Sequence, residues 1–141
     1  LLRNLSSKNT VRIIPGPEIK SFEKESVIEF INSSYTISIE SDRMGYRLEG
    51  AELKHLKGAD INSAGLSYGT IQVPGNGKPI IMLSDRQTVG GYTRLANIIS
   101  VDIPLLGQMK PGDILNFKEI SLDDAQDLFQ LENLQVQNLV K

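Results

Sequence analysis

The sequence contains no cysteine and only one histidine, His55. Without cysteine the chain forms no disulfide, binds no metal through thiolates and performs no thiol chemistry, and the absence fits a reducing cytosol. One histidine is too few for a histidine-based metal cluster, so we expect no metal site. Nothing in the sequence around His55 indicates a general base, and we interpret it as a surface or loop histidine.

The charges are balanced and dispersed. Fifteen Lys and Arg face seventeen Asp and Glu, for a formal net charge of −2, and no stretch gathers about five like charges. This balance argues against nucleic-acid binding. No window reaches the roughly 18 apolar residues of a membrane helix, and no basic segment followed by an apolar run opens the chain. We therefore expect no membrane association and a soluble, cytoplasmic protein.

The length of the chain predicts one domain. Its 141 residues are 40% apolar, which is enough for a core without disulfides or metal. Residues 1–10 are largely polar and aperiodic, and we interpret them as an unanchored segment or an inter-domain linker. Residues 11–141 then form the domain. Because the chain opens with Leu1 rather than Met, we expect it to come from a longer polypeptide.

Short strands dominate the pattern. Tyr35, Ile37 and Ile39 alternate with polar residues, as in a half-buried strand. Asn76-Gly77, between two β-rich runs, offers the positive φ angles of a tight hairpin turn. Strands are predicted at Val11–Ile14, Tyr35–Ile39, Gly45–Leu48, Thr70–Val73, Pro79–Leu83 and Ile114–Ile120, and residues 95–101 fit either a strand or a helix.

Helices are fewer. The spacing of apolar residues predicts an amphipathic helix over residues 20–31, and residues 104–109 are predicted to form a short helix. Ser121, with Asp124 three residues later, matches a helix N-cap, so a final helix should run from Leu122 towards Val140. Residues 50–69 read as a long surface connection with one helical turn. This content favours a mainly β fold, a closed or nearly closed β-barrel with peripheral helices and a C-terminal helix, over a doubly wound parallel sheet.

Residues 75–78, Gly-Asn-Gly-Lys, have some features of a phosphate-binding loop. The glycine spacing of such a loop is wrong here, and Pro79 stands where a Ser or Thr would bind magnesium. We interpret the segment as a hairpin turn.

The strongest local anomaly is Ser84–Tyr92. An apolar run ends abruptly in Asp85, Arg86, Gln87 and Thr88, and a glycine pair and an aromatic residue follow. Polar groups crowded at a strand end beside glycines can bind a small polar ligand. Equally, Asp85 and Arg86 can pair with each other and with the loop backbone and only fix a tight connection. The residues alone leave both readings open.

A second segment repeats the first. Residues 41–48 echo the Ser-Asp-Arg and Gly-Tyr of residues 84–92, and both follow a strand-like run. If the two corners converge, Asp42, Arg43, Asp85 and Arg86 form one polar patch. If they lie apart, each pair is a local clamp.

Several blocks in order resemble the C-terminal half of allophanate hydrolase subunit 2 proteins. The family is also called the biotin-dependent carboxyltransferase or KipI-antagonist family, and it includes the C subunit of 5-oxoprolinase. The resemblance extends from Val11 to about Ala125. It is carried by residues 12–17 (RIIPGP), 41–50 (SDRMGYRLEG), 69–77 (GTIQVPGNG), 85–88 (DRQT), 90–92 (GGY) and 111–113 (PGD).

The resemblance implies a cyclophilin-like β-barrel and an N-terminal domain that this chain lacks. It implies a protein that works with two others, the homologous, KipI-like B subunit of the enzyme and its A subunit, in ATP-dependent cleavage of 5-oxoproline to glutamate, the isolated domain being inactive. ATP serves the whole complex. No biotin-attachment signature surrounds Lys110, so no covalent biotin is expected, and the fold alone does not imply proline isomerisation.

On this reading a small amide or lactam is the substrate. Its predicted binding residues are Asp42, Arg43, Asp85, Arg86, Gln87, Thr88 and Tyr92, and no catalytic residue is assigned. The alternative is a regulatory binding module that antagonises KipI, the inhibitor of a sporulation histidine kinase. A third possibility is that the motifs only preserve the corners of the barrel.

Overall fold

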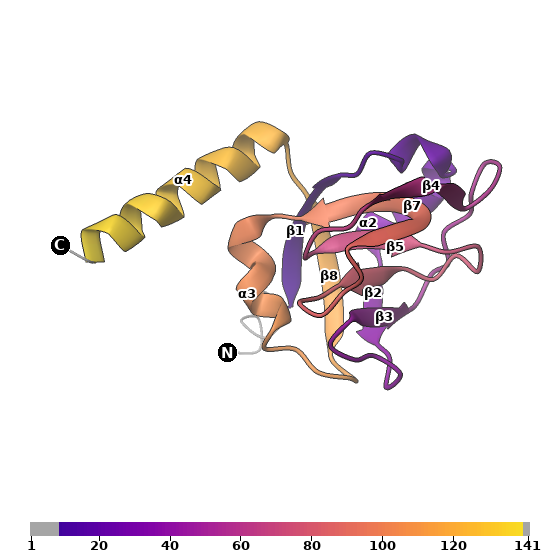
Figure 1. Cartoon of the computed structure of the whole chain (residues 1–141), viewed down its shortest axis with the longest axis horizontal. Helices are drawn as coiled ribbons and strands as arrows, with labels where there is room; N and C mark the ends of the chain where they lie inside the picture. Colours follow the sequence, from indigo (N-terminus) through magenta and orange to yellow (C-terminus); the bar gives the residue numbers. More distant parts are fainter. Residues whose placement is uncertain (1–8, 140–141) are drawn as a thin grey trace.

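The computed structural model describes residues 9–139, which form a closed sheet with helices around it (Figure 1). The strands lie where apolar residues alternate with polar ones or run together. The strands are β1 (Thr10–Pro15), β2 (Ser34–Ile37), β3 (Gly45–Glu49), β4 (Asp60–Gly65), β5 (Thr70–Val73), β6 (Ile80–Met82), β7 (Val89–Ile98) and β8 (Ile114–Glu119). The helices are η1 (Ile19–Ser21), α2 (Lys24–Asn32), η2 (Ser100–Asp102), α3 (Ile103–Leu106) and α4 (Leu122–Leu139).

The sheet closes on itself. Its strand order is β1-β8-β2-β3-β6-β5-β7-β4, and β1 also pairs with β7. The seven strands from β1 to β7 in this order therefore form a barrel, while β4 extends the sheet beyond β7. β1 runs parallel to β8 and antiparallel to β7. The predicted closed barrel with peripheral helices and a C-terminal helix is confirmed.

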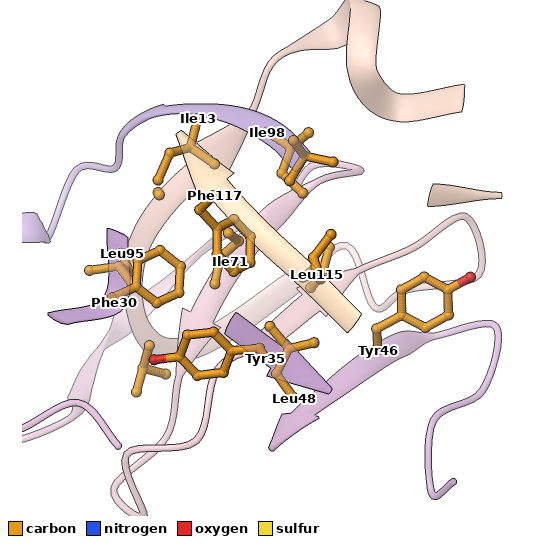
Figure 2. Close-up of a cluster of buried hydrophobic side chains, with 14 of the residues drawn as sticks. Ile13, Phe30, Tyr35, Tyr46, Leu48, Ile71, Leu95, Ile98, Leu115 and Phe117 are labelled. Carbon is orange, nitrogen blue, oxygen red and sulfur yellow. The ribbon is translucent and has the colours of Figure 1, made fainter. Parts of the chain in front are cut away.

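Aromatic and branched side chains fill the barrel, so it encloses a core and not a channel. Phe30 of α2 stacks on Phe117 of β8, with ring centroids 4.4 Å apart. Figure 2 shows these rings with Tyr35 among the aliphatic residues of the facing strands. The Tyr35 hydroxyl donates to the carbonyl of Ala51 at 2.7 Å, and burial raises the pKa of that phenol well above its usual value.

A half-buried ion pair holds β1 at the point of closure. Asp102 is only 3% exposed, and its carboxylate accepts hydrogen bonds from Arg12 N at 2.7 Å, Nε at 3.0 Å and Nη2 at 2.6 Å. Hydrogen bonding to Asp102 raises the pKa of the Arg12 guanidinium. Paired bonds to a planar guanidinium define both distance and orientation. The pair therefore sets where β1 lies relative to η2.

The Leu122 helix begins where it was predicted. Asp124 N donates to Ser121 Oγ at 3.1 Å, which is the expected N-cap. Figure 1 shows α4 extending away from the barrel. Its first turns contact the barrel, where Leu122 and Phe129 line a cavity of about 250 Å³ with Ile99. Among residues 9–139 no helix has both the length and the apolar character required to span a bilayer.

Most predicted strands match the observed ones. The predicted hairpin is confirmed, because β5 and β6 pair antiparallel. Of the two turn residues only Gly77 has a positive φ, of 77°, and the connection spans residues 74–79. Residues 95–98 belong to β7 and are therefore strand. Residues 1–8 of the predicted N-terminal segment lie outside the described residues. So do residues 140–141, at the predicted end of the last helix. Thr10, the last residue of the predicted N-terminal segment, already belongs to β1.

Several predicted boundaries are wrong, and one is the end of the helix predicted over residues 104–109, which stops at Leu106. The helix predicted from residue 20 begins at Lys24, after the separate turn η1. β2 ends at Ile37, because the chain turns at Ser38, whose Oγ accepts from Glu40 N at 3.1 Å, and Ile39 is 87% exposed. The predicted loop over residues 50–69 contains no helical turn and forms β4 instead, whose side chains are mostly exposed and so lack an apolar alternation.

Replacing Asp102 by asparagine tests the closure pair. We expect Asp102→Asn to lower the free energy of unfolding by about 1–2 kcal/mol, because it removes the charge partner of Arg12, whose side chain is 34% exposed and so is partly screened by solvent. Urea titration at neutral pH measures the change. The control is Lys110→Ala, which removes an ion pair to Asp113 with a lysine that is 77% exposed, and it should cost less than about 0.5 kcal/mol. Equal effects of the two substitutions would contradict the role given to Asp102.

Candidate functional site

The two Ser-Asp-Arg corners lie side by side. Residues 41–44 lead into β3, and residues 83–88 connect β6 to β7. Asp85 N donates to the carbonyl of Arg43 and Leu83 N to the carbonyl of Met44, each at 3.1 Å. The repeat in the sequence therefore marks two adjacent corners at one end of the barrel.

Two of the charged side chains at these corners are engaged in holding the loops. Asp42 Oδ1 accepts from the backbone N–H groups of Met44 at 2.9 Å and Gly45 at 3.3 Å. Arg86 Nε donates to the carbonyl of Leu66, and its Nη1 donates to that of Leu83, each at 3.2 Å. These contacts show the clamp that the sequence allowed as one of two readings.

The expected pairing of Asp85 with Arg86 is not formed. Within residues 9–139, Asp85 makes no ion pair with Arg86. The Arg86 guanidinium lies instead 5.9 Å from the centroid of the Tyr68 ring, at cation–π distance. Arg86 is half-buried and Asp85 is exposed. Arg86 thus fixes the corner through backbone carbonyls and an aromatic face.

Two cavities flank the corners. The first, here called the strand cavity, has a volume of about 180 Å³ and is lined by residues that include Asp42, Arg47, Leu66, Gln72, Met82 and Gln87. The second, the corner cavity, has a volume of about 300 Å³ and is lined by residues that include Asp42, Arg43, Tyr46, Tyr68 and Ser84.

The structure distributes the predicted binding residues unevenly. Asp42 lines both cavities, Gln87 lines the strand cavity and Arg43 lines the corner cavity. The other four line neither cavity: Asp85, Arg86, Thr88 and Tyr92. The 42–43 and 85–86 pairs consequently share no cavity wall, although their backbones touch. Their part in binding stays a prediction.

Tyr92 and the glycine pair belong to a strand. We predicted flexible glycines beside a polar loop, but Gly90 and Gly91 lie within β7, which pairs with β4 through Ala64 opposite Gly90 and Asp60 opposite Tyr92. Strand interiors that contain glycine often mark a close approach of other groups. A Cβ at Gly90 would lie 2.8 Å from Leu66 Cδ1. Gly90 is therefore needed for packing and not for flexibility.

Arg47 and Gln72 are two cavity residues that sequence reasoning missed. Both lie in strands that had been predicted, with their neighbours Tyr46, Leu48, Ile71 and Val73 buried in the core. Alternation alone places Arg47 and Gln72 on the outer face of the barrel. What the sequence did not reveal is that β6 brings these two outer faces together.

His55 has a structural position. It lies in the loop before β4, where its Nε2 is 2.9 Å from Thr93 Oγ1 and its ring packs 4.6 Å from that of Phe22 between centroids. Burial lowers the pKa of the imidazole, which favours its neutral form. The predicted loop location is correct. Within residues 9–139, no group of three His, Asp or Glu side chains is placed to bind a metal ion.

A second half-buried ion pair lies beside the strand cavity. Glu18 accepts from Arg94 N at 3.0 Å, Nε at 2.8 Å and Nη2 at 2.8 Å, and Arg94 Nη1 donates to the carbonyl of Gly65 at 3.2 Å. These bonds join the segment after β1 to β7 and to the end of β4. Hydrogen bonding to Arg94 holds the pKa of the Glu18 carboxyl below its usual value.

The family model described as "Carboxyltransferase domain, subdomain A and B" matches residues 2–119. The chain is 43% identical over 117 residues to the C subunit of 5-oxoprolinase from Escherichia coli, covering 83% of this chain and 38% of that protein. It is 35% identical over 121 residues to the C subunit of 5-oxoprolinase from Haemophilus influenzae, covering 86% and 39%. The chain thus spans about two fifths of the length of these relatives.

Solved structures agree with the fold. Urea amidolyase of K. lactis superposes with a TM-score of 0.84 at 25% identity, covering 92% of this chain and 8% of that one. Urea carboxylase of Kluyveromyces lactis gives the same TM-score and identity, with 92% and 12% covered. Helix α4, from Leu122, lies beyond the residues that the family model matches.

Replacing Arg86 distinguishes a clamp from a free ligand group. We expect Arg86→Ala to lower the free energy of unfolding by about 1–2 kcal/mol, because two backbone carbonyls lose their donor. The matched control is Arg43→Ala in the twin corner, an exposed arginine whose loss should cost less than about 0.5 kcal/mol. Chemical denaturation of both variants measures the difference. A fully stable Arg86→Ala protein would show that the clamp contributes nothing to folding.

The Glu18–Arg94 pair predicts a dependence of stability on pH. The pKa of Glu18 is lower in the folded than in the unfolded chain, so its contribution is complete above the unfolded value of about 4.3 and declines as the pH falls through the folded value. We therefore expect Glu18→Gln to destabilise the protein at pH 7 and to have a smaller effect at pH 3. Urea unfolding at both values measures this, and a difference that persists unchanged in acid would contradict it.

Proposed function

Because the chain belongs to the family of the carboxyltransferase domain, subdomain A and B, we propose that it is the C-terminal domain of a 5-oxoprolinase C subunit. The observation that carries the proposal is the 43% identity to the Escherichia coli protein over most of the chain. In this proposal the full protein works with the A subunit of the enzyme and with its B subunit, to which it is homologous. Together they cleave 5-oxoproline to glutamate with the consumption of ATP.

The chemistry of the relatives supports a small amide as the substrate. 5-Oxoproline is a cyclic amide, and the yeast proteins of the same fold are named for urea, which is also an amide. A cavity of about 180 Å³ is of a size that suits such compounds, since an apolar cavity of about 150 Å³ binds benzene. The predicted residues Asp42 and Gln87 line that cavity. We propose that the domain contributes substrate binding at this end of the barrel.

The catalytic step and the ATP site are proposed to lie in the assembled complex. His55 is hydrogen-bonded to Thr93 and packed on Phe22, so its role is structural. The Gly-Asn-Gly-Lys segment forms the turn between β5 and β6, with Gly77 N donating to the carbonyl of Pro74 at 3.0 Å, and this turn gives no reason to place ATP there. The isolated domain should accordingly be inactive.

Reconstitution tests the proposed function. The full-length protein that contains this chain is combined with the A and B subunits of the same enzyme, and glutamate release from 5-oxoproline is measured with and without ATP. We expect ATP-dependent turnover that disappears when this protein is omitted. Urea serves as the control substrate and should not be consumed. Equal turnover without this protein would contradict an enzymatic role, and would leave the regulatory binding module as the better account.

A further inference from the structure

Side chains from three neighbouring strands form the floor of the strand cavity. In the barrel register Arg47 of β3 lies opposite Ile80 of β6, and Ile80 lies opposite Gln72 of β5. Two pairs further along, and so on the same face, Gly45 lies opposite Met82. The residues that alternate with these are buried in the barrel, so this row faces outward. Arginine and glutamine are thus held on rigid strands on either side of an apolar side chain.

Two glycines keep the space above this floor free. A Cβ at Gly45 would lie 2.9 Å from Ile80 Cγ2, and a Cβ at Gly90 would lie 2.8 Å from Leu66 Cδ1 and 3.2 Å from Gln72 Oε1. Both distances to carbon are shorter than van der Waals contact allows. Any larger residue at either position would therefore displace the side chains that line the cavity. Gly45 and Gly90 stand in the two corner motifs, which gives those motifs a purpose other than the loop clamp.

Three polar side chains in this cavity are not used by the fold. Gln72 Oε1 is buried without a hydrogen-bond partner among the described residues. Within residues 9–139 the side chains of Arg47 and Gln87 likewise make no hydrogen bond or ion pair. The neighbouring Arg86 and Arg94, in contrast, are each bonded to the protein. Arg47 and Gln87 are exposed, whereas a buried polar atom without a partner, such as Gln72 Oε1, is rare and calls for an explanation.

Resting on the proposed function, we propose that the strand cavity is the 5-oxoproline subsite of this domain. Arg47 binds the carboxylate of the substrate, and the carboxamides of Gln72 and Gln87 bind the lactam group. The apolar side chains of Leu66 and Met82 contact the methylene groups of the ring. Arg47 and not Arg86, one of the predicted binding residues, is placed on the carboxylate, because the Arg86 guanidinium is already bonded to two carbonyls.

The chemical match is specific. A lactam holds its N–H and its C=O on the same edge of the ring, and a carboxamide offers one acceptor and one donor on the edge that faces it. A guanidinium binds a carboxylate through two parallel hydrogen bonds. The Asp42 carboxylate at the rim is already bonded to two backbone N–H groups, and Arg47 remains the cavity's one arginine. A small anion that carries a cyclic amide fits this set.

The test measures KM and kcat for 5-oxoproline in the reconstituted enzyme. We expect Arg47→Ala to raise KM at least tenfold with kcat within about twofold, which is the signature of lost substrate binding. Gln72→Leu should raise KM as well without lowering the melting temperature, because Gln72 Oε1 has no partner to lose. The control is Lys118→Ala, an exposed cation on β8, which should leave both constants unchanged.

A second ligand isolates the role of Arg47. 2-Pyrrolidinone has the same lactam ring without the carboxylate, so its inhibition constant should be equal for wild type and Arg47→Ala and higher for Gln72→Leu. An active enzyme in which Arg47→Ala and Gln72→Leu both keep the wild-type KM overturns this subsite and leaves the proposed function standing. A wild-type complex without 5-oxoprolinase activity contradicts the proposed function, and direct titration of 5-oxoproline then decides. Binding that Arg47→Ala loses supports the subsite, and no binding by the wild-type protein overturns it.

Discussion

The structure depends on the position of β1, which has a partner on each side. It pairs in parallel with β8 and antiparallel with β7, and within residues 9–139 no other strand joins these two parts of the sheet. Arg12, in the middle of β1, places its backbone N–H and its guanidinium on the buried carboxylate of Asp102. The Asp102 carboxylate accepts from both the backbone N–H and the guanidinium of Arg12. The position and the orientation of β1 are therefore fixed together. The pairing of β1 with both β7 and β8 closes the barrel, and the contact with Asp102 holds β1 in that place.

A closed barrel with a filled interior leaves only its rim and outer face for ligands. The strands supply rigid positions there, because every second residue points outward and its neighbours are locked in the core. The corners supply the walls, and two of their four charged side chains, Asp42 and Arg86, are bonded to the backbone. Sites on this domain thus combine groups from the strands, such as Arg47 and Gln72, with groups and walls from the loops, such as Gln87.

The sequence predicted the fold well because its signals are local. Alternation, turn glycines and the Ser121 cap each act within a few residues, and the strands and helix they predict are present. β4 was missed because it is an edge strand with exposed side chains and carries no apolar alternation. At the site, the sequence pointed to Arg86 but did not show that its guanidinium is bonded to the carbonyls of Leu66 and Leu83. It also did not show that strand register places Arg47 and Gln72 on either side of Ile80. Which donors already have an acceptor, and which residues of two strands lie opposite each other, depend on contacts between distant parts of the chain. A local sequence pattern therefore does not predict them.

The strand order also has a consequence for synthesis on the ribosome. β8, which is made last among the strands, lies between β1 and β2, which are made first. Until residue 119 has emerged, β2 has an unpaired edge, and exposed edges are templates for pairing with other chains. Non-local pairings of this kind form slowly and leave the nascent chain open to aggregation. The newly made domain is therefore protected from aggregation through this edge only after β8 has emerged and paired, and not when the earlier hairpins form.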